Sequence, residues 1–185
     1  IINNKGVDVP AIKKMTDIIR HRGPDDEGFF LSTDDNRIFI AGGPDTPAKV
    51  WSSITPYQPD INISDVPLNT FRVAFGHRRV SLLDLSPAGH QPMSYANGRY
   101  WIVLNGEIYN YIEIRSELMS LGYRFISNCD TEVVLAAWQH WGIDCQAHFN
   151  GMWSFVIYDS ESKFIFLSRD RFGIKPLYYW FASDG

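Results

Sequence analysis

The sequence has little cysteine, no basic stripe and no long apolar run. Cys129 and Cys145 are the only cysteines among 185 residues, and their spacing is not that of a metal site. We expect two ordinary buried thiols in a reducing cytoplasm. The 17 basic and 21 acidic residues form no stripe that would bind nucleic acid. Apolar runs are short, and the first residues do not resemble a signal peptide, so no membrane contact is expected.

Common catalytic signatures are also missing. The sequence contains no P-loop, no dinucleotide-binding G-x-G-x-x-G, no H-E-x-x-H and no G-x-S-x-G. Asp25, Asp26 and Glu27 form an acidic turn, for which a solvated charge run is the expectation rather than a metal site. No metal is therefore expected. Core or surface roles are expected for the five scattered histidines, His21, His77, His90, His140 and His148.

Apolar and aromatic residues are abundant. Hydrophobic residues make up 45% and aromatic residues 15%, which indicates a globular chain. The length suits a single domain, residues 1–185, with a core that needs no disulfide or metal. The stretch from Gly42 to Pro67 is rich in proline and has no periodicity, so we expect a long loop there.

Hydrophobic periodicity predicts helices and strands in a mixed order. Helices are expected after Asp8, with Pro10 in the first turn, after Asn110, and over Thr131–Trp141 with Asp130 as the cap. Strands are expected over residues 37–41, 71–77, 100–104, 152–159, 164–170 and 176–185. This order predicts an α+β fold with largely antiparallel sheets, in which two sheets pack together with helices outside.

Asn105-Gly106 follows the apolar run Tyr100–Leu104 and has two interpretations. Asn-Gly between apolar runs is a strong signal for a hairpin turn. The residues after Gly106 soon take a helical period, which instead indicates a junction from strand to helix, where sites are common. At such a junction an Asn amide and an adjacent backbone N–H can together stabilise a developing oxyanion.

Three charged residues are candidates for binding an amino-acid-like ligand. The guanidinium of Arg79 matches a carboxylate bidentately, although a surface or ion-pair arginine is the simpler interpretation. Glu107 and Asp130 could together accept the N–H donors of an ammonium group, and Asp130 could equally be a helix N-cap. Cys129 has no histidine or cation near it in the sequence, so we expect an inert thiol rather than a nucleophile.

Six segments give the chain a specific resemblance to a known family. In order they are RHRGPDDEG, FGHRRVSLLDLSPAGHQPM, LNGEIYNYIEIR, CDTEVVLAAW, FNGMWSFVIYD and SRDRFGIKPLYY. In these segments the chain resembles the glutaminase domain of glutamine-hydrolysing asparagine synthetases, class II amidotransferases with an N-terminal nucleophile. The resemblance covers almost the whole chain apart from residues 42–67, which look like an insertion. It implies a four-layer αββα sandwich with two mainly antiparallel sheets between helix layers.

The resemblance also implies a reaction and the residues that perform it. Glutamine is hydrolysed to glutamate and ammonia by an N-terminal cysteine whose own α-amine is the base. Arg79 matches the residue that binds the glutamine α-carboxylate, and Glu107 and Asp130 match those that bind its α-ammonium group. Asn105 and the Gly106 N–H match the oxyanion hole. No cofactor is implied for this domain.

Two departures from the family pattern change this expectation. The family begins with Met-Cys-Gly-Ile, whereas the printed chain begins at Ile1-Ile2. Neither Cys129 nor Cys145 has the free α-amine that the mechanism needs, so we expect the polypeptide as printed not to hydrolyse glutamine. The chain also stops at Gly185, before the family's ATP-pyrophosphatase domain, which would use ATP and Mg²⁺ to make asparagine from aspartate.

The implied partners are L-glutamine and that C-terminal domain of the same polypeptide, and a homodimer is left open. Two other functions are open at this point. One is a non-catalytic module that binds glutamine or serves as a scaffold. The other is an amidotransferase that acts on a sugar or peptide acceptor, which only the downstream domain would distinguish.

Overall fold

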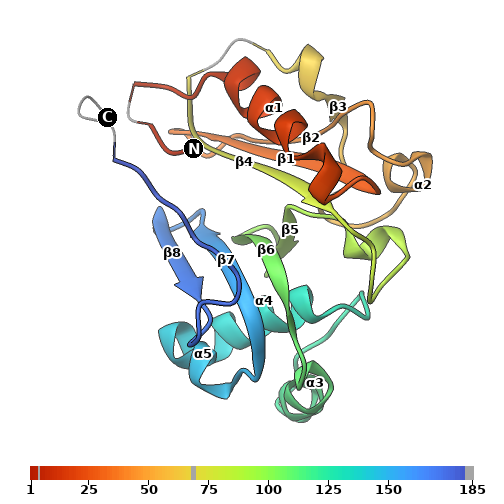
Figure 1. Cartoon of the computed structure of the whole chain (residues 1–185), viewed down its shortest axis with the longest axis vertical. Helices are drawn as coiled ribbons and strands as arrows, with labels where there is room; N and C mark the ends of the chain where they lie inside the picture. The colour runs from red at the N-terminus through yellow and green to blue at the C-terminus, as the bar shows by residue number, and fades with distance from the viewer. Residues whose placement is uncertain (4, 68–69, 182–185) are drawn as a thin grey trace. The chain divides into compact units, whose positions relative to one another are not determined.

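The computed structural model describes residues 1–3, 5–67 and 70–181, and these form two compact units. The first unit comprises Ile1–Pro92 together with the described residues Trp180 and Phe181. The second comprises Met93–Tyr179. Each unit contains one four-stranded sheet and its own helices, as Figure 1 shows.

The sheet of the first unit has the strand order β3-β2-β1-β4. Its strands are β1 (Asp26–Thr33), β2 (Ile38–Gly42), β3 (Ile61–Asn62) and β4 (Phe71–Arg79). β1 pairs antiparallel with β2 and β4, and the short β3 pairs parallel with β2. Helix α1 (Val9–Ile18) packs against β4, because Ile12 and Thr16 face the sheet and are buried. Apolar residues of α1, β1 and β4 form the core, among them Ile12, Phe29, Leu31, Phe71 and Ala74.

Short elements complete the first unit. They are helix α2 (Ala48–Trp51) and the 3-10 turns η1 (Arg20–Arg22), η2 (Ile63–Asp65) and η3 (Pro87–Gly89). The expected long loop over residues 42–67 is therefore wrong in part, because α2, β3 and η2 lie within it. Proline-rich sequence hides such short elements, since a single helical turn has no periodicity to detect.

The sheet of the second unit has the order β5-β6-β7-β8, with every neighbouring pair antiparallel. Its strands are β5 (Met93–Tyr95), β6 (Tyr100–Ile108), β7 (Gly151–Asp159) and β8 (Phe164–Arg169). Its helices are α3 (Tyr111–Ser120), α4 (Asp130–Trp141) and α5 (Cys145–His148), with the 3-10 turn η4 (Gly142–Asp144) between the last two. Helix α4 packs against β5, β6 and α3, and its first nine residues are all buried.

Most expected elements are present, and the α+β class with two mainly antiparallel sheets is confirmed. Strand β1 was not expected, because its acidic start looks like a turn. The strand expected over residues 176–185 is wrong for Pro176–Phe181, which have no regular structure, and its Asp184-Gly185 end lies outside the described residues. The stacking of the sheets into four layers stays a prediction of the resemblance. Among the described residues, no helix is long and apolar enough to cross a membrane.

Candidate functional site

Strand β6 runs without interruption through Asn105-Gly106. The two residues pair with Ser154 and Trp153 of β7, and the ladder continues to Ile108. A hairpin turn at this position is therefore excluded. A Cβ on Gly106 would overlap the carbonyl oxygen of Met152 and lie 2.6 Å from the Cα of Trp153, so only glycine allows the two backbones to approach this closely. The Asn105 side chain is exposed at this end of the sheet.

Asp130 lies next to the same strand end. It is 4% exposed, and its Oδ2 accepts a hydrogen bond from the backbone N–H of Ile108 at 2.9 Å. It is the first residue of α4, whereas Cys129 occupies the N-cap position, so the N-cap interpretation of Asp130 is wrong by one residue. The structure thus brings Asp130 together with the Asn105–Ile108 end of β6.

Burial raises the pKa of Asp130 above its ordinary value. The backbone N–H groups of Ile108 and Thr131 oppose this shift, and the nearby Glu107 carboxylate adds to it. A cation bound near Asp130 would offset both the burial of its carboxylate and the charge of Glu107. This is the electrostatic arrangement that an ammonium group requires.

Arg79 belongs to the first unit, where it is the last residue of β4. Its guanidinium donates to the carbonyl oxygen of Ser86 at 3.4 Å and to that of Asp84. The side chain is largely buried, so the interpretation as a surface arginine is wrong. Carbonyl acceptors hold the guanidinium in place without cancelling its charge, which leaves it suited to a carboxylate.

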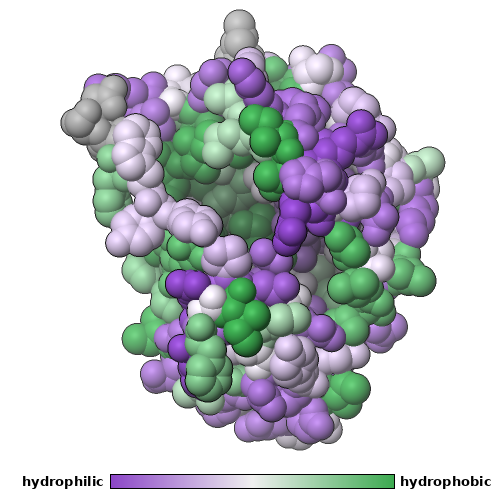
Figure 2. Space-filling model, viewed as in Figure 1, coloured by the Kyte–Doolittle hydropathy of each residue, from purple (hydrophilic) through white to green (hydrophobic). Residues whose placement is uncertain are grey.

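A pocket of about 260 Å³ lies beside Arg79 within the first unit. Its other lining residues are Asp25, Asp26, Pro47, Lys49, Val50, Ser81 and Leu85. Leu82 and Leu85 in the loop after β4 are 75% and 63% exposed, and Figure 2 shows hydrophobic surface over this loop. The pocket therefore combines charged groups with an apolar rim.

The acidic turn is not the solvated charge run that we expected. Asp26 and Glu27 begin β1 and are 2% and 1% exposed, whereas Asp25 is exposed. Asp26 lies opposite Arg79 in the sheet, and its Oδ2 is 2.8 Å from Nδ1 of His90, a fully buried residue. The apolar Phe29-Phe30-Leu31 directly after the turn was the available signal for a buried strand.

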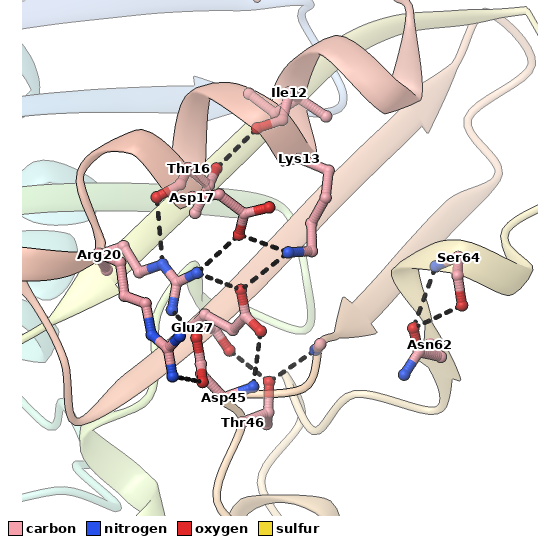
Figure 3. A network of polar contacts seen from close by, with 12 residues as sticks. Ile12, Lys13, Thr16, Asp17, Arg20, Glu27, Asp45, Thr46, Asn62 and Ser64 are labelled. Atoms are coloured by element: carbon pink, nitrogen blue, oxygen red, sulfur yellow. Dashed lines mark hydrogen bonds and ion pairs between the residues drawn. The ribbon is translucent and has the colours of Figure 1, made fainter.

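Glu27 lies opposite Arg78, and the two buried residues belong to an ionic network (Figure 3). The Arg78 guanidinium is 2.9 Å from Glu27, 2.8 Å from Asp17 and 2.7 Å from Asp45. Since successive strand residues face opposite sides of a sheet, Arg78 and Glu27 share the α1 side and Arg79 and Asp26 share the other. Sequence reasoning missed this network, because its members are far apart in the chain.

The two cysteines are free and buried. Burial raises the pKa of Cys129, and it raises the pKa of Cys145 to about 12. Both thiols are therefore protonated and inert at neutral pH. Within the described part of the chain, no group of three or more histidine, cysteine, aspartate or glutamate residues is placed to hold a metal ion.

Sequence comparison places the chain in a family. The family described as a glutamine amidotransferase domain matches residues 64–185. The chain belongs to this family. Within it, the chain is 36% identical over 173 residues to glutamine-hydrolysing asparagine synthetase 1 of Bacillus subtilis, covering 94% of this chain and 21% of that protein. It is 35% identical over 187 residues to a putative asparagine synthetase 2 of Methanocaldococcus jannaschii, covering 94% and 29%.

These relatives confirm the resemblance to the glutaminase domain of asparagine synthetases. The chain spans less than a third of the length of either relative. Among solved structures, glutamine phosphoribosylpyrophosphate amidotransferase from B. subtilis aligns with a TM-score of 0.53 at 18% identity. The alignment covers 82% of this chain and 32% of that one. At this identity the likeness concerns the fold alone, and it supports the α+β fold with two mainly antiparallel sheets.

Proposed function

We propose that this chain is the glutaminase part of an asparagine-synthetase-type amidotransferase. It hydrolyses the side-chain amide of L-glutamine to glutamate and ammonia, and the ammonia serves an ATP-dependent synthetase domain of the same polypeptide that makes asparagine from aspartate. The observation that carries this proposal is the placement of Asp130 against the Asn105–Ile108 end of β6. ATP and Mg²⁺ belong to the synthetase domain in this proposal.

Each candidate residue has a role that follows from its chemistry. Arg79 binds the α-carboxylate of glutamine through paired N–H donors. Glu107 and Asp130 accept the three N–H bonds of its α-ammonium group. Both of these groups are bonded to the α-carbon of glutamine, so in this proposal their binding orients the side-chain amide for attack.

The side-chain amide is attacked by a thiol in this proposal. As the tetrahedral intermediate forms, negative charge develops on the former carbonyl oxygen, and the Asn105 amide and the Gly106 N–H donate hydrogen bonds to it. The nucleophile is an N-terminal cysteine preceding Ile1, whose α-amine takes the thiol proton and passes it to the leaving ammonia. Water then hydrolyses the resulting glutamyl thioester, which releases glutamate and restores the thiol. Cys129 and Cys145 cannot replace it, since both are buried and lack a free α-amine.

The test uses the full-length protein with its N-terminal cysteine. Glutamate release from glutamine is expected, and Asn105→Ala should lower kcat by about 10²–10³ because one oxyanion donor is lost. Asparagine synthesis from added ammonia is the control and should be unchanged in this variant. Glutamine binding without glutamate release would instead favour a non-catalytic binding module. Transfer of the ammonia to an acceptor other than aspartate would identify a different amidotransferase.

The 185-residue chain gives a second test. We propose that it releases no glutamate, because neither of its cysteines meets the requirement for an α-amine base. Steady glutamate release by the purified chain would contradict this part of the proposal.

A further inference from the structure

The segment Gly42–Pro67 is firmly attached to the sheet at its beginning. Glu27 of β1 accepts a hydrogen bond from the backbone N–H of Asp45 at 2.8 Å, and the Asp45 carboxylate is 2.7 Å from the Arg78 guanidinium. The Thr46 hydroxyl donates to the Glu27 carbonyl at 2.7 Å and accepts from the Gly43 N–H at 2.8 Å. Figure 3 shows these contacts around Glu27. The segment therefore starts from a rigid base.

Further along, the same segment contacts the loop that follows β4, residues 80–92, here called the Arg79 loop. Tyr57 is 1% exposed, and its hydroxyl donates to the carbonyl oxygen of Ala88 at 2.6 Å. Lys49 donates through Nζ to the carbonyl oxygen of Leu85. Both contacts reach backbone atoms, so they constrain the path of the loop rather than one side chain.

The Arg79 loop in turn surrounds the Arg79 guanidinium. The carbonyl oxygens of Asp84 and Ser86 accept its hydrogen bonds. Gly89 packs so closely that a Cβ there would overlap the guanidinium. At the far end of the loop, His90 is held by Asp26 of β1. The position of the guanidinium is thus set by a loop of irregular backbone, and the segment 42–67 supports that loop.

We propose that the segment Gly42–Pro67 positions the Arg79 guanidinium for the glutamine α-carboxylate, with Tyr57 as the main positioning residue. This inference rests on the proposed function. Bidentate recognition of a carboxylate depends on the orientation of the guanidinium, and small displacements of a binding group weaken it. The segment therefore supports the substrate site through the Arg79 loop, and its residues Pro47, Lys49 and Val50 line the pocket beside Arg79.

The experiment measures glutamine hydrolysis by the full-length protein carrying Tyr57→Phe. Loss of the hydrogen bond should raise KM for glutamine roughly two- to tenfold, with kcat and the melting temperature little changed. Tyr95→Phe is the matched control, because the Tyr95 hydroxyl also donates to a backbone carbonyl, that of Arg124 at 2.9 Å, but in the other unit. It should leave KM unchanged.

A double-mutant cycle tests whether Tyr57 acts through Arg79. Arg79→Ala should raise KM strongly, and adding Tyr57→Phe to it should cause no further rise, because coupled residues are non-additive. An equal KM rise from Tyr57→Phe in both backgrounds would overturn the inference. A second pair of variants tests the base of the segment. Thr46→Val, which loses the hydroxyl, should raise KM for glutamine. Thr46→Ser, which keeps the hydroxyl, should have a KM close to that of the wild type.

The outcomes separate this inference from the proposed function. If Arg79→Ala raises KM but Tyr57→Phe and Thr46→Val do not, the inference is wrong and the role of Arg79 stands. If Arg79→Ala leaves KM unchanged, the proposed role of Arg79 is itself wrong, and the inference fails with it.

Discussion

The Asp130 carboxylate and the Ile108 backbone N–H form a hydrogen bond of 2.9 Å that joins the start of α4 to the end of β6. Ile108 directly follows Glu107, so this single bond brings Asp130 to the part of β6 that carries Glu107. Burial and the charge of Glu107 both raise the pKa of Asp130. The strand end is therefore a place where a bound cation lowers the electrostatic free energy.

Asp130→Asn separates the structural from the binding role of this residue. An Asn side-chain oxygen can still accept the Ile108 N–H, so the melting temperature should stay near that of the wild type. The charge that attracts the glutamine ammonium is lost, and KM for glutamine in the full-length protein should rise about tenfold or more. Asp130→Ala loses both the charge and the acceptor for the Ile108 N–H, so it should in addition lower the melting temperature. An unchanged KM in Asp130→Asn would show that Asp130 does not bind substrate.

Gly106→Ala should destabilise the second unit through a backbone clash. The added Cβ would overlap the Met152 carbonyl, and neither strand can move without breaking the β6–β7 ladder. We expect a loss of about 2 kcal/mol in the free energy of unfolding, measured by urea denaturation. Gly98→Ala is the comparison: its φ of +82° is unfavourable for alanine, but no atom lies within 4 Å of the new Cβ. Gly98→Ala should lower the free energy of unfolding less than Gly106→Ala does. Equal losses in the two variants would argue against the backbone clash at Gly106.

Glu27→Gln should be strongly destabilising. The Glu27 side chain is 0% exposed and 2.9 Å from the Arg78 guanidinium, which is 1% exposed. Removing the Glu27 charge leaves the buried Arg78 guanidinium with only the more exposed Asp17 and Asp45 carboxylates as counter-ions, which should cost about 3 kcal/mol. Asp17→Asn, at the 46% exposed edge of the same network, should cost less than about 1 kcal/mol. Urea denaturation of both variants measures the loss of unfolding free energy in each. Equal losses would mean that burial of the charge does not determine how much stability is lost.

Asp159 should make the free energy of unfolding depend on pH over a defined acidic range. Burial favours a higher pKa for Asp159, but hydrogen bonds from Arg99 and from the N–H groups of Glu161 and Ser162 outweigh it and lower the pKa to about 2. An acid whose folded pKa is lowered stabilises the protein above its unfolded pKa, and the contribution is lost as pH falls toward the folded value. The stabilisation should therefore be complete at pH 7 and decline from about pH 4 toward pH 2.

Urea denaturation of wild type and Asp159→Asn at pH 7 and pH 3 measures this effect. The difference in unfolding free energy between the two proteins should be smaller at pH 3. Asp8→Asn is a control, because Asp8 is exposed and makes no capping hydrogen bond. A difference for Asp159→Asn that does not change with pH would contradict the assignment.

The sequence predicted the regular elements better than the contacts between them. The hairpin of β7 and β8 and helix α4 follow from apolar patterns that are local. Strand β1 was missed because the sequence around Asp26 and Glu27 is typical of a turn. Their burial depends on partners far away in the chain, His90 for Asp26 and Arg78 for Glu27. Asp130 was placed one position off for a similar reason, since its partner Ile108 lies 22 residues away in the chain.

The candidate site residues were predicted from motifs, but the contacts that hold them in place were not. Arg79, Glu107 and Asp130 stand in recognisable segments, whereas Tyr57 lies in a proline-rich stretch that gives no pattern to interpret. Its hydrogen bond to Ala88 spans 31 positions and depends on how two irregular loops fold against each other. Such contacts come from tertiary packing, which single-sequence reasoning cannot supply.

The neighbouring arginines of β4 have a consequence for comparing sequences. Arg78 lies on the helix side of the sheet in an ionic network, and Arg79 lies on the opposite side beside the pocket. The two arginines look interchangeable in the sequence, but shifting an alignment by one position here exchanges the residue of the ionic network for the one that we propose binds substrate. Relatives with a single arginine in this strand should therefore be aligned on the residue opposite Glu27, so that the retained side chain is assigned to the correct face.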